Sequence, residues 1–121
     1  MARFKNQVAI VTGSAQGIGK AVALQLGSEG ALVVSVDQNE DGARTTAEEC
    51  GNQSIGIHCD IGDPEQVTAL HERVERDCGR LDVLVNNASI VPFIAWDDVN
   101  FDHWRQIMRV NLDGTFLMCR S

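Results

Sequence analysis

The strongest constraint on the fold comes from a short apolar run that leads directly into a glycine-rich turn. Residues 7–12 read QVAIVT, and Gly13, Gly17 and Gly19 follow them. A helical pattern of apolar residues covers 17–29. Glycine lets the backbone turn tightly and approach a ligand closely. Because an apolar run is joined to a helix through this turn, we predict a strand–loop–helix unit at the start of the chain.

The same alternation of strand and helix continues along the sequence. Apolar strands are expected at 32–37, 54–59 and 81–86, and helices at 42–50, at 64–78 behind an Asp63 N-cap, and from about Phe101. Apolar strands that alternate with helices are typical of a parallel sheet covered on both faces. We therefore predict an α/β fold with a doubly wound parallel sheet in the strand order 3-2-1-4.

Two features of the second half indicate a surface that needs a further partner. The strand expected at 81–86 would form a sheet edge although it is as apolar as a central strand, and open apolar edges favour aggregation. The last helix carries an apolar stripe that reaches Cys119 without a terminator. We expect residues 1–121 to be the N-terminal part of a longer polypeptide. The alternative is a short gene product that pairs with another chain.

Charge and composition exclude several classes of partner. A formal net charge of −7 and a pI near 4.7 argue against nucleic acid, which needs a basic patch. No apolar run approaches the ~20 residues that span a bilayer, and none behind the N-terminus is long enough for a signal peptide. We therefore expect no membrane partner and a cytoplasmic location. The four cysteines form no Cys-x-x-Cys pair, so we expect reduced thiols and no metal site.

The glycine turn and the second strand together predict a dinucleotide site. A helix N-terminus offers unpaired N–H groups and a positive dipole end, which suit a pyrophosphate. Asp37 ends the second strand, where a carboxylate can accept hydrogen bonds from the adenosine ribose and repel a 2′-phosphate. Gln16 and Gln38 are neutral, so the pattern favours NAD over NADP. The alternatives are a tight turn without a ligand and a solvated aspartate at a strand end.

These motifs resemble, in order, those of the short-chain dehydrogenase/reductase family, whose fold is a Rossmann fold. The resemblance covers essentially the whole chain. It rests on TGSAQGIG at 12–19, Asp37, Asp60-Ile61, Asn86-Asn87-Ala88-Ser89 and Asn111 within VNLDGTF. Ser89 stands where the family motif has glycine, so the conformation of the turn at this position could differ slightly from that of the family.

The resemblance also implies roles for individual residues. Asp60 and Ile61 would hold the adenine ring, Asn87 and Ala88 would lie along the cofactor, and Asn86 would tie neighbouring strands together. The cofactor-binding residues expected in this way are Gly13, Gln16, Gly17, Ile18, Gly19, Asp37, Asp60, Ile61, Asn87 and Ala88.

The family's acid–base machinery has no match in this sequence. The family uses a serine and a Tyr-x-x-x-Lys pair, in which tyrosine transfers the proton and lysine lowers the tyrosine pKa. The chain contains no tyrosine, and its two lysines are Lys5 and Lys20. We therefore expect residues 1–121 to be the NAD-binding portion of a single domain, inactive alone, that stops before the catalytic serine, tyrosine and lysine. The alternative is a catalytically silent dinucleotide-binding module.

Asn111 matches the family's catalytic asparagine, which relays protons through a water molecule. It also interrupts an apolar stripe that includes Ile107 and Met108. A buried amide without hydrogen-bond partners is costly, by roughly 1–3 kcal/mol. The alternative role is therefore a core asparagine that pairs with backbone groups.

The family resemblance finally implies a small-molecule alcohol or carbonyl substrate and a homo-oligomer whose interface uses the final helix. Residues 89–96 read SIVPFIAW, an apolar loop that could form a wall of a substrate pocket. Equally, another part of the structure could cover it. The loop is similar to that of family members acting on pyridoxal.

Overall fold

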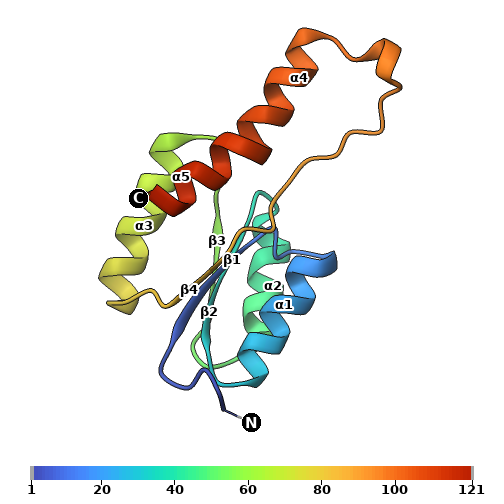
Figure 1. The fold of residues 1–121 in the computed structure, drawn as a ribbon. Coiled ribbons are helices and arrows are strands. Elements are labelled where there is room, and N and C mark those ends of the chain that lie inside the picture. The colour runs from blue at the N-terminus through green and yellow to red at the C-terminus, as the bar shows by residue number, and fades with distance from the viewer. Residues whose placement is uncertain (1, 121) are drawn as a thin grey trace.

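The computed structural model describes residues 2–120, which form a four-stranded parallel sheet with helices on both faces (Figure 1). The strands lie in the order β3-β2-β1-β4, which confirms the predicted doubly wound arrangement. Their bounds are Val8–Thr12 for β1, Leu32–Asp37 for β2, Ile55–His58 for β3 and Val83–Val85 for β4.

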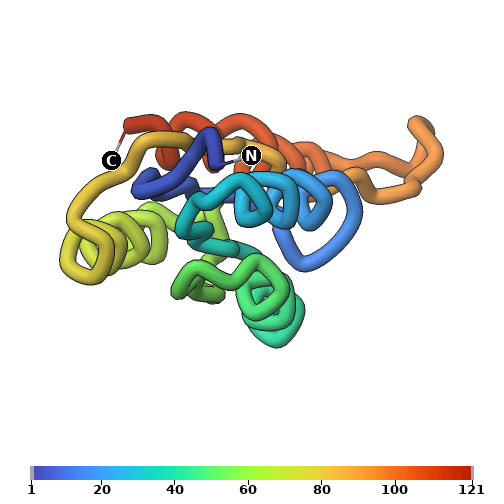
Figure 2. Tube along the Cα trace, turned by 90° about the horizontal axis from the view of Figure 1, so that it is seen from below, coloured from blue at the N-terminus to red at the C-terminus, as the bar shows by residue number. Residues whose placement is uncertain are grey.

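Helices α1 and α2 cover one face of the sheet, and α3 and α5 cover the other (Figures 1 and 2). The bounds are Gly17–Ser28 for α1, Glu40–Cys50 for α2, Pro64–Cys78 for α3, Phe101–Met108 for α4 and Gly114–Arg120 for α5. A π-helical turn, η2, joins α4 to α5 over Arg109–Asp113, and a short 3-10 turn, η1, covers Trp96–Asp98. No described helix is both long and apolar enough to span a bilayer.

The central strand β1 contributes to two separate apolar cores because successive side chains of a strand point to opposite faces. Val8 and Ile10 pack in the core under α3 and α5, and Ala9 and Val11 pack in the core under α1. All four residues are at most 4% exposed. Burial on both faces explains why this strand is continuously apolar.

The ends of the elements differ from the predictions by a few residues. Helix α2 begins at Glu40 rather than Gly42, because the Asn39 side chain accepts a hydrogen bond from the Gly42 N–H and caps the helix. Helix α3 has the predicted bounds 64–78 and begins after Asp63, and Gly79 follows its last turn in a left-handed conformation. The strands predicted at 7–12, 54–59 and 81–86 are shorter than expected at one or both ends.

The final helix contains an irregularity that the apolar periodicity did not predict. It begins near Phe101 as expected, but the π-helical turn at η2 interrupts its regular α-helical pattern. Such turns insert an extra residue and often occur at functional sites. Here the turn carries Val110 toward the core and places Asn111 next to it.

Candidate functional site

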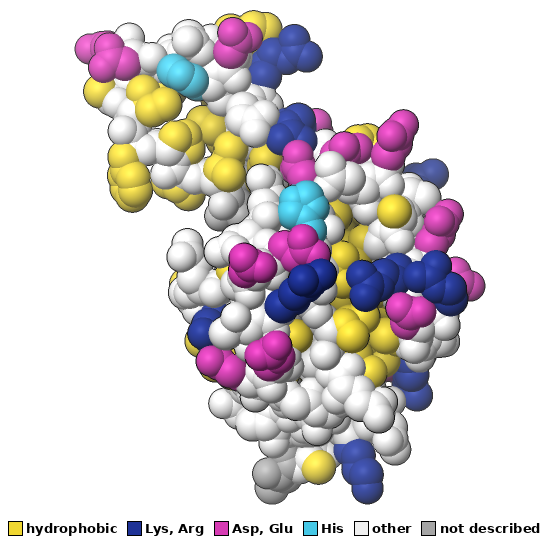
Figure 3. Space-filling view, turned by 180° about the vertical axis from the view of Figure 1, so that it is seen from behind, with side chains coloured by type: hydrophobic (Ala, Val, Ile, Leu, Met, Phe, Trp, Pro, Cys, Tyr) yellow, Lys and Arg dark blue, Asp and Glu magenta, His cyan; other side chains and the backbone are white. Residues whose placement is uncertain are grey.

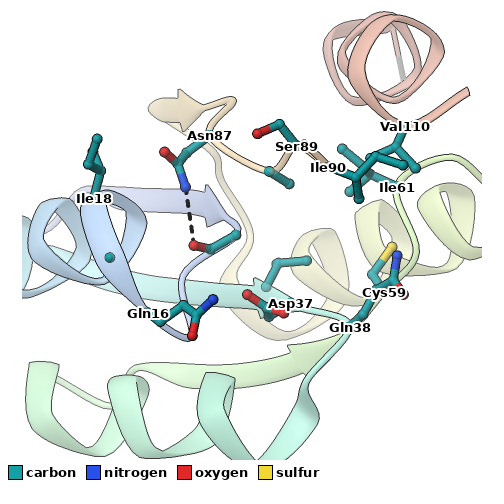
Figure 4. Close-up of a pocket in the computed structure, with 14 residues that line it drawn as sticks. Gln16, Ile18, Asp37, Gln38, Cys59, Ile61, Asn87, Ser89, Ile90 and Val110 are labelled. Atoms are coloured by element: carbon teal, nitrogen blue, oxygen red, sulfur yellow. Dashed lines mark hydrogen bonds between the residues drawn. The ribbon is translucent and has the colours of Figure 1, made fainter. Parts of the chain in front are cut away.

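A cavity of about 450 Å³ lies at the carboxyl ends of β1, β2 and β4 (Figure 4). Open parallel sheets bind ligands at this edge, near the point where strand order reverses. The predicted cofactor-binding residues in its lining are Gly13, Gln16, Gly17, Ile18, Asp37, Ile61, Asn87 and Ala88. Gly19, Asp60 and Asn111 lie outside the lining of this cavity.

Six further lining residues were not among the expected cofactor-binding residues: Val36, Gln38, Cys59, Ser89, Ile90 and Val110. A usable signal was present for three of them. Val36, Cys59 and Val110 each directly precede a predicted site residue, Asp37, Asp60 and Asn111. Their apolar character indicated only a core position, which they also occupy.

The glycine turn packs so closely that side chains would not fit at two of its positions. A Cβ atom at Gly19 would lie 2.1 Å from the Gly13 carbonyl oxygen, and one at Gly13 would lie 2.8 Å from the Asn87 amide nitrogen. Gly13 also has a φ of +66°, which other residues rarely adopt. The turn therefore requires glycine for packing as well as for conformation.

The first turn of α1 faces the cavity without a side-chain cap. Gln16 is the N-cap residue, but its side chain makes no capping hydrogen bond. The free backbone N–H groups at this end can therefore donate to a bound anion. Below the turn, the buried Ser14 hydroxyl lies 2.6 Å from the Ser35 hydroxyl, and the Thr46 hydroxyl donates to the Ser14 carbonyl oxygen at 2.9 Å. These bonds hold the loop rigidly in place.

Asp37 lies in the middle of the cavity between the glycine turn and its apolar end (Figure 4). One carboxylate oxygen accepts the Ala15 N–H at 3.0 Å, and the other accepts the Asn39 N–H at 2.9 Å. The carboxylate thus fixes the glycine turn and remains half-buried at the cavity surface. Each oxygen keeps a further lone pair for a ligand hydroxyl. Lys and Arg are both absent from the described residues of the lining.

Thr12 makes the contacts that sequence reasoning expected of Asn86. The buried Thr12 hydroxyl donates to the Val85 carbonyl oxygen and accepts the N–H groups of Asn87 and Ala88 at 3.1 and 3.0 Å. Asn86 is exposed, and its amide donates to Cys119 Sγ at 3.4 Å. Among the described residues the Asn86 side chain therefore contacts the last helix, and Thr12 is the residue that ties β1 to β4.

Asn87 connects the segment after β4 to the glycine turn. Its amide nitrogen donates to the Gly13 carbonyl oxygen at 3.1 Å, a contact drawn in Figure 4. Ala88 and Ser89 continue this wall of the cavity. The exposed Ser89 side chain belongs to this wall, so replacing glycine by serine adds a hydroxyl to the lining.

The Asp60 carboxylate is engaged by protein groups. One oxygen accepts the Gly62 N–H at 2.9 Å, and the other pairs with Arg109 at 3.0 Å. The neighbouring Ile61 is 4% exposed and lines the cavity. In this pair, Ile61 presents the surface that a ligand would meet.

Asn111 directs its amide to the backbone of Ile90. The side-chain oxygen accepts the Ile90 N–H at 2.8 Å, and the side-chain nitrogen donates to the Ile90 carbonyl oxygen at 2.9 Å. This two-bond contact pairs both ends of the amide and fixes Ile90, which lines the cavity. The Asn111 side chain thus pairs with backbone groups, as expected for the alternative, structural role of this residue.

The thiol at the apolar end of the cavity is held neutral. Burial raises the pKa of Cys59 to about 11, with smaller contributions from the nearby Asp60 and Asp63 carboxylates. A neutral thiol is a poor nucleophile and a poor metal ligand. All four cysteines are free thiols, and residues 2–120 contain no cluster of three His, Cys, Asp or Glu side chains that could hold a metal ion.

Comparisons with known proteins agree with this architecture. The family model described as short chain dehydrogenase matches residues 7–121. The chain is 36% identical to a D-threitol dehydrogenase of Mycolicibacterium smegmatis, with 98% of this chain and 47% of the relative covered. It is 40% identical to a 3beta-hydroxysteroid dehydrogenase of Mediterraneibacter gnavus, with 100% of this chain and 45% of that relative covered.

The structural match is equally extensive. A 3-ketoacyl-(acyl-carrier-protein) reductase from Brucella melitensis, solved in complex with NADH, superposes with a TM-score of 0.91 at 33% identity. The superposition covers 97% of this chain and 48% of that one. The chain therefore spans about half the length of these two curated relatives and of this solved structure.

Proposed function

Because the chain belongs to the short-chain dehydrogenase family, we propose that it supplies the NAD-binding half of an oxidoreductase that interconverts an alcohol and its carbonyl. The observation that carries this proposal is the cavity at the uncapped N-terminus of α1, with Asp37 in its centre. The N–H groups of the first turn of α1 would bind the pyrophosphate. When bound, the nicotinamide would accept or donate the hydride.

Asp37 supports NAD rather than NADP as the cofactor. Its oxygens face the position next to the pyrophosphate site, where the adenosine ribose would lie, and can accept the ribose hydroxyls. A 2′-phosphate would meet this carboxylate, and Gln16 and Gln38 offer it no positive charge. The contact from Asp37 to the Ala15 N–H also orients the glycine turn, so one carboxylate would both shape the site and select the cofactor.

The remaining cofactor-binding residues act in two groups. Gly13, Gly17 and Gly19 provide the close turn, and Gln16 and Ile18 stand beside it. Ile61, with Asp60 behind it, would contact the adenine, whereas Asn87 and Ala88 would form the wall along the cofactor. These assignments follow the family motif residue by residue.

We propose that proton transfer depends on residues outside these 121, because the chain has no tyrosine. Asn111 is proposed as the family's proton-relay asparagine, with its side chain positioning Ile90. In a protein carrying the full active site, Asn111→Leu should lower kcat far more than it weakens NAD binding. A lowered Tm with nearly unchanged kcat would make Asn111 a structural residue only.

The apolar segment after β4 supports a small-molecule substrate with an apolar body. Ile90 lines the cofactor cavity, and Val91, Pro92 and Ile94 line a neighbouring apolar hollow against α4. A pyridoxal-like ring alcohol or aldehyde is one substrate class compatible with such a wall. The names of the relatives include a polyol and a steroid, so this segment rather than the shared fold would select the substrate.

We also propose a cytoplasmic homo-oligomer. Large apolar side chains on the last helices are exposed, with Trp104 at 46%, Leu112 at 63% and Phe116 at 60%. Figure 3 shows hydrophobic side chains gathered on the projecting part of the molecule, and the α4–α5 face would pack against a second copy.

Calorimetric titration with NAD and NADP tests the cofactor proposal. We expect NAD to bind more tightly, Asp37→Ala to reduce the ratio of the two affinities, and the double variant Asp37→Ala/Gln38→Arg to shift the ratio further toward NADP. Asp41→Ala removes an exposed carboxylate from α2 and serves as the matched charge control. If the ratio does not move in the Asp37 variants, the role of Asp37 is wrong. If no dinucleotide binds, the whole proposal fails.

A further inference from the structure

Arg109 forms a link between two segments that are far apart in the sequence. Its Nη1 donates to an Asp60 carboxylate oxygen at 3.0 Å, and its Nε donates to the Gln106 side-chain oxygen at 3.0 Å. The ion pair is about two-thirds to four-fifths buried, since the two side chains are 32% and 22% exposed. Exposed ion pairs contribute little, but a partly buried pair with further hydrogen bonds is better protected from solvent screening.

The backbone beneath the guanidinium is shaped to receive it. A Cβ atom at the buried Gly62 would lie 2.3 Å from Arg109 Nη1. The Gly62 N–H also donates to the second Asp60 oxygen at 2.9 Å. Asp60 is therefore held from both sides, and the absence of a side chain at residue 62 leaves space for the arginine.

Each end of this link is adjacent to a residue that lines the cavity. Asp60 precedes Ile61, and Arg109 precedes Val110; these two apolar side chains meet at the same end of the cavity (Figure 4). Ile61 and Val110 are 4% and 2% exposed. The ion pair thus joins the turn between β3 and α3 to the π-helical turn η2, just behind the surface that both segments present.

This apolar end is where the adenine of the proposed cofactor would lie. With the pyrophosphate at the first turn of α1 and the ribose at Asp37, the base must extend away from the glycine turn. On that side the lining includes Gln38, Cys59, Ile61, Ile90 and Val110 (Figure 4). The flat apolar faces of the base would pack between such side chains.

We propose that Arg109 is a positioning residue of the dinucleotide site, which holds the Ile61 and Val110 walls at the spacing required by the adenine ring. The inference rests on the proposed function, and it assigns a role in the dinucleotide site to a residue that does not line the cavity. Its action is indirect: Arg109 fixes Asp60, and the two segments then present a preorganised slot. Preorganised walls increase affinity because less motion is lost when the ligand binds.

Two variants break the link in different ways. Arg109→Met removes the charge and the donors but retains an unbranched side chain suited to a helix. Gly62→Ala retains every charge, and its Cβ would displace the guanidinium from Asp60. Arg109→Lys retains the charge but cannot reproduce both hydrogen bonds. Arg105→Met is the matched control, because Arg105 is exposed on α4, four residues before Arg109, and lies over the Phe101 ring.

The test measures the binding of NAD by calorimetry and of its two halves, AMP and nicotinamide mononucleotide, by ligand-observed NMR. We expect Arg109→Met and Gly62→Ala to weaken NAD and AMP by the same factor, about fivefold to tenfold, with nicotinamide mononucleotide unchanged. Arg109→Lys should fall in between, and Arg105→Met should stay within about twofold. Adding Asp60→Asn to Arg109→Met should cause little further loss, because both act through one contact.

Each of the following outcomes overturns the inference. Unchanged AMP affinity in Arg109→Met with a lowered Tm would make the ion pair purely structural. Equal losses of affinity for AMP and for nicotinamide mononucleotide would indicate general loosening of the fold. A loss of AMP affinity in Arg105→Met as large as that in Arg109→Met would indicate an effect of long-range charge alone. If the unsubstituted chain binds NAD, and Arg109→Met and Gly62→Ala bind NAD and AMP with the same affinity as the unsubstituted chain, only the role of Arg109 fails. If it binds neither NAD nor AMP, the proposed function fails with it.

Discussion

The segment up to α3 and the segment after β4 use apolar residues in opposite ways. Before residue 80 the large apolar side chains are mostly buried, as in Ile10, Val34 and Leu70. Among the described residues from 81 onward, only Val110 and Met118 belong to the buried core, whereas Phe93 is 101% exposed and Trp96 79% exposed. Most large apolar side chains of the first segment are therefore buried within the protein, whereas the second segment presents a surface that another molecule or segment could cover.

This difference separates two kinds of functional information. Asp37 accepts the Ala15 N–H of the glycine turn, and Thr12 bonds to Asn87 and Ala88, so the cavity is shaped by contacts within the chain. The residues around α4 project from the layered body (Figures 1 and 2), and their role depends on what they contact. Substitutions in the two regions should therefore affect different measurements.

The largest effect is expected at Gly19. In Gly19→Ala the new Cβ would meet the Gly13 carbonyl oxygen at 2.1 Å, which should lower the free energy of unfolding by about 3 kcal/mol and abolish measurable NAD binding. Gly17→Ala is the matched control, because its Cβ meets nothing within 4 Å and only the φ of +62° is unfavourable. That variant should lose about 1 kcal/mol. Equal denaturation curves for the two variants would contradict the packing role of Gly19.

Thr12→Val should give the next largest effect. The substitution keeps the shape of the side chain but leaves the N–H groups of Asn87 and Ala88 without their acceptor. Loss of these partly buried bonds should lower the free energy of unfolding by about 2 kcal/mol. Chemical denaturation measures this change, and Thr45→Val, at an exposed position of α2, is the control. A stability equal to that of the unsubstituted chain would show that Thr12 does not tie these segments.

The pH dependence of stability should reflect His71 on α3. Both ring nitrogens are buried without a partner among the described residues, and burial lowers the pKa of the imidazole. Histidines of the unfolded state titrate at about pH 6.5. At and just below this pH the folded state therefore binds fewer protons than the unfolded state. The free energy of unfolding should therefore be retained above this pH and decrease as the pH falls through it.

Thermal unfolding at about pH 7.5 and about pH 5.5 checks the sign of this effect. In His71→Leu the difference in Tm between the two conditions should shrink, whereas His58→Leu, at an exposed position, should retain it. A larger Tm at the lower pH would contradict the assignment. Glu75 and Arg80 line the same hollow as His71, so salt should alter the size of the effect but not its sign.

The smallest effect on stability is expected on the exposed face of α5. Phe116→Ser should change the free energy of unfolding by no more than about 0.5 kcal/mol, because the side chain is already 60% exposed. Self-association measured by analytical ultracentrifugation should fall in the same variant. Val110→Ser, on the buried side of the same helical segment, should be strongly destabilised instead. A similar stability loss in both would remove the distinction between the two faces.

The sequence predicted the sheet order and the glycine turn because both depend on patterns over short stretches of chain. The apolar alternation of residues 7–37 and the position of Asp37 needed no knowledge of distant residues. The contacts of Thr12 with Asn87 and Ala88 join positions more than seventy residues apart, and the ion pair of Arg109 with Asp60 is also long-range. Residue type alone does not reveal which distant groups such side chains will reach.

The π-helical turn was missed for a related reason. Periodicity shows that residues 101–120 have an apolar stripe, but one inserted residue changes the direction of Arg109, Val110 and Asn111 relative to it. The amide of Asn111 then pairs with the backbone of Ile90. From the sequence, pairing with backbone groups is an alternative role for Asn111, but the sequence does not identify Ile90 as the partner. Tertiary contacts therefore decided the local geometry of this half of the site.

Backbone amide chemical shifts during an NAD titration test the central claim most directly. If the cavity binds the dinucleotide, the amides of Gly13 to Gly19, Gln38, Ile61 and Val110 should shift with one common dissociation constant. The amides of Trp104 and Phe116, on the exposed face, should remain unchanged. Shifts confined to α4 and α5, or no shift in the glycine turn at saturating NAD, would contradict a dinucleotide site at the carboxyl end of the sheet.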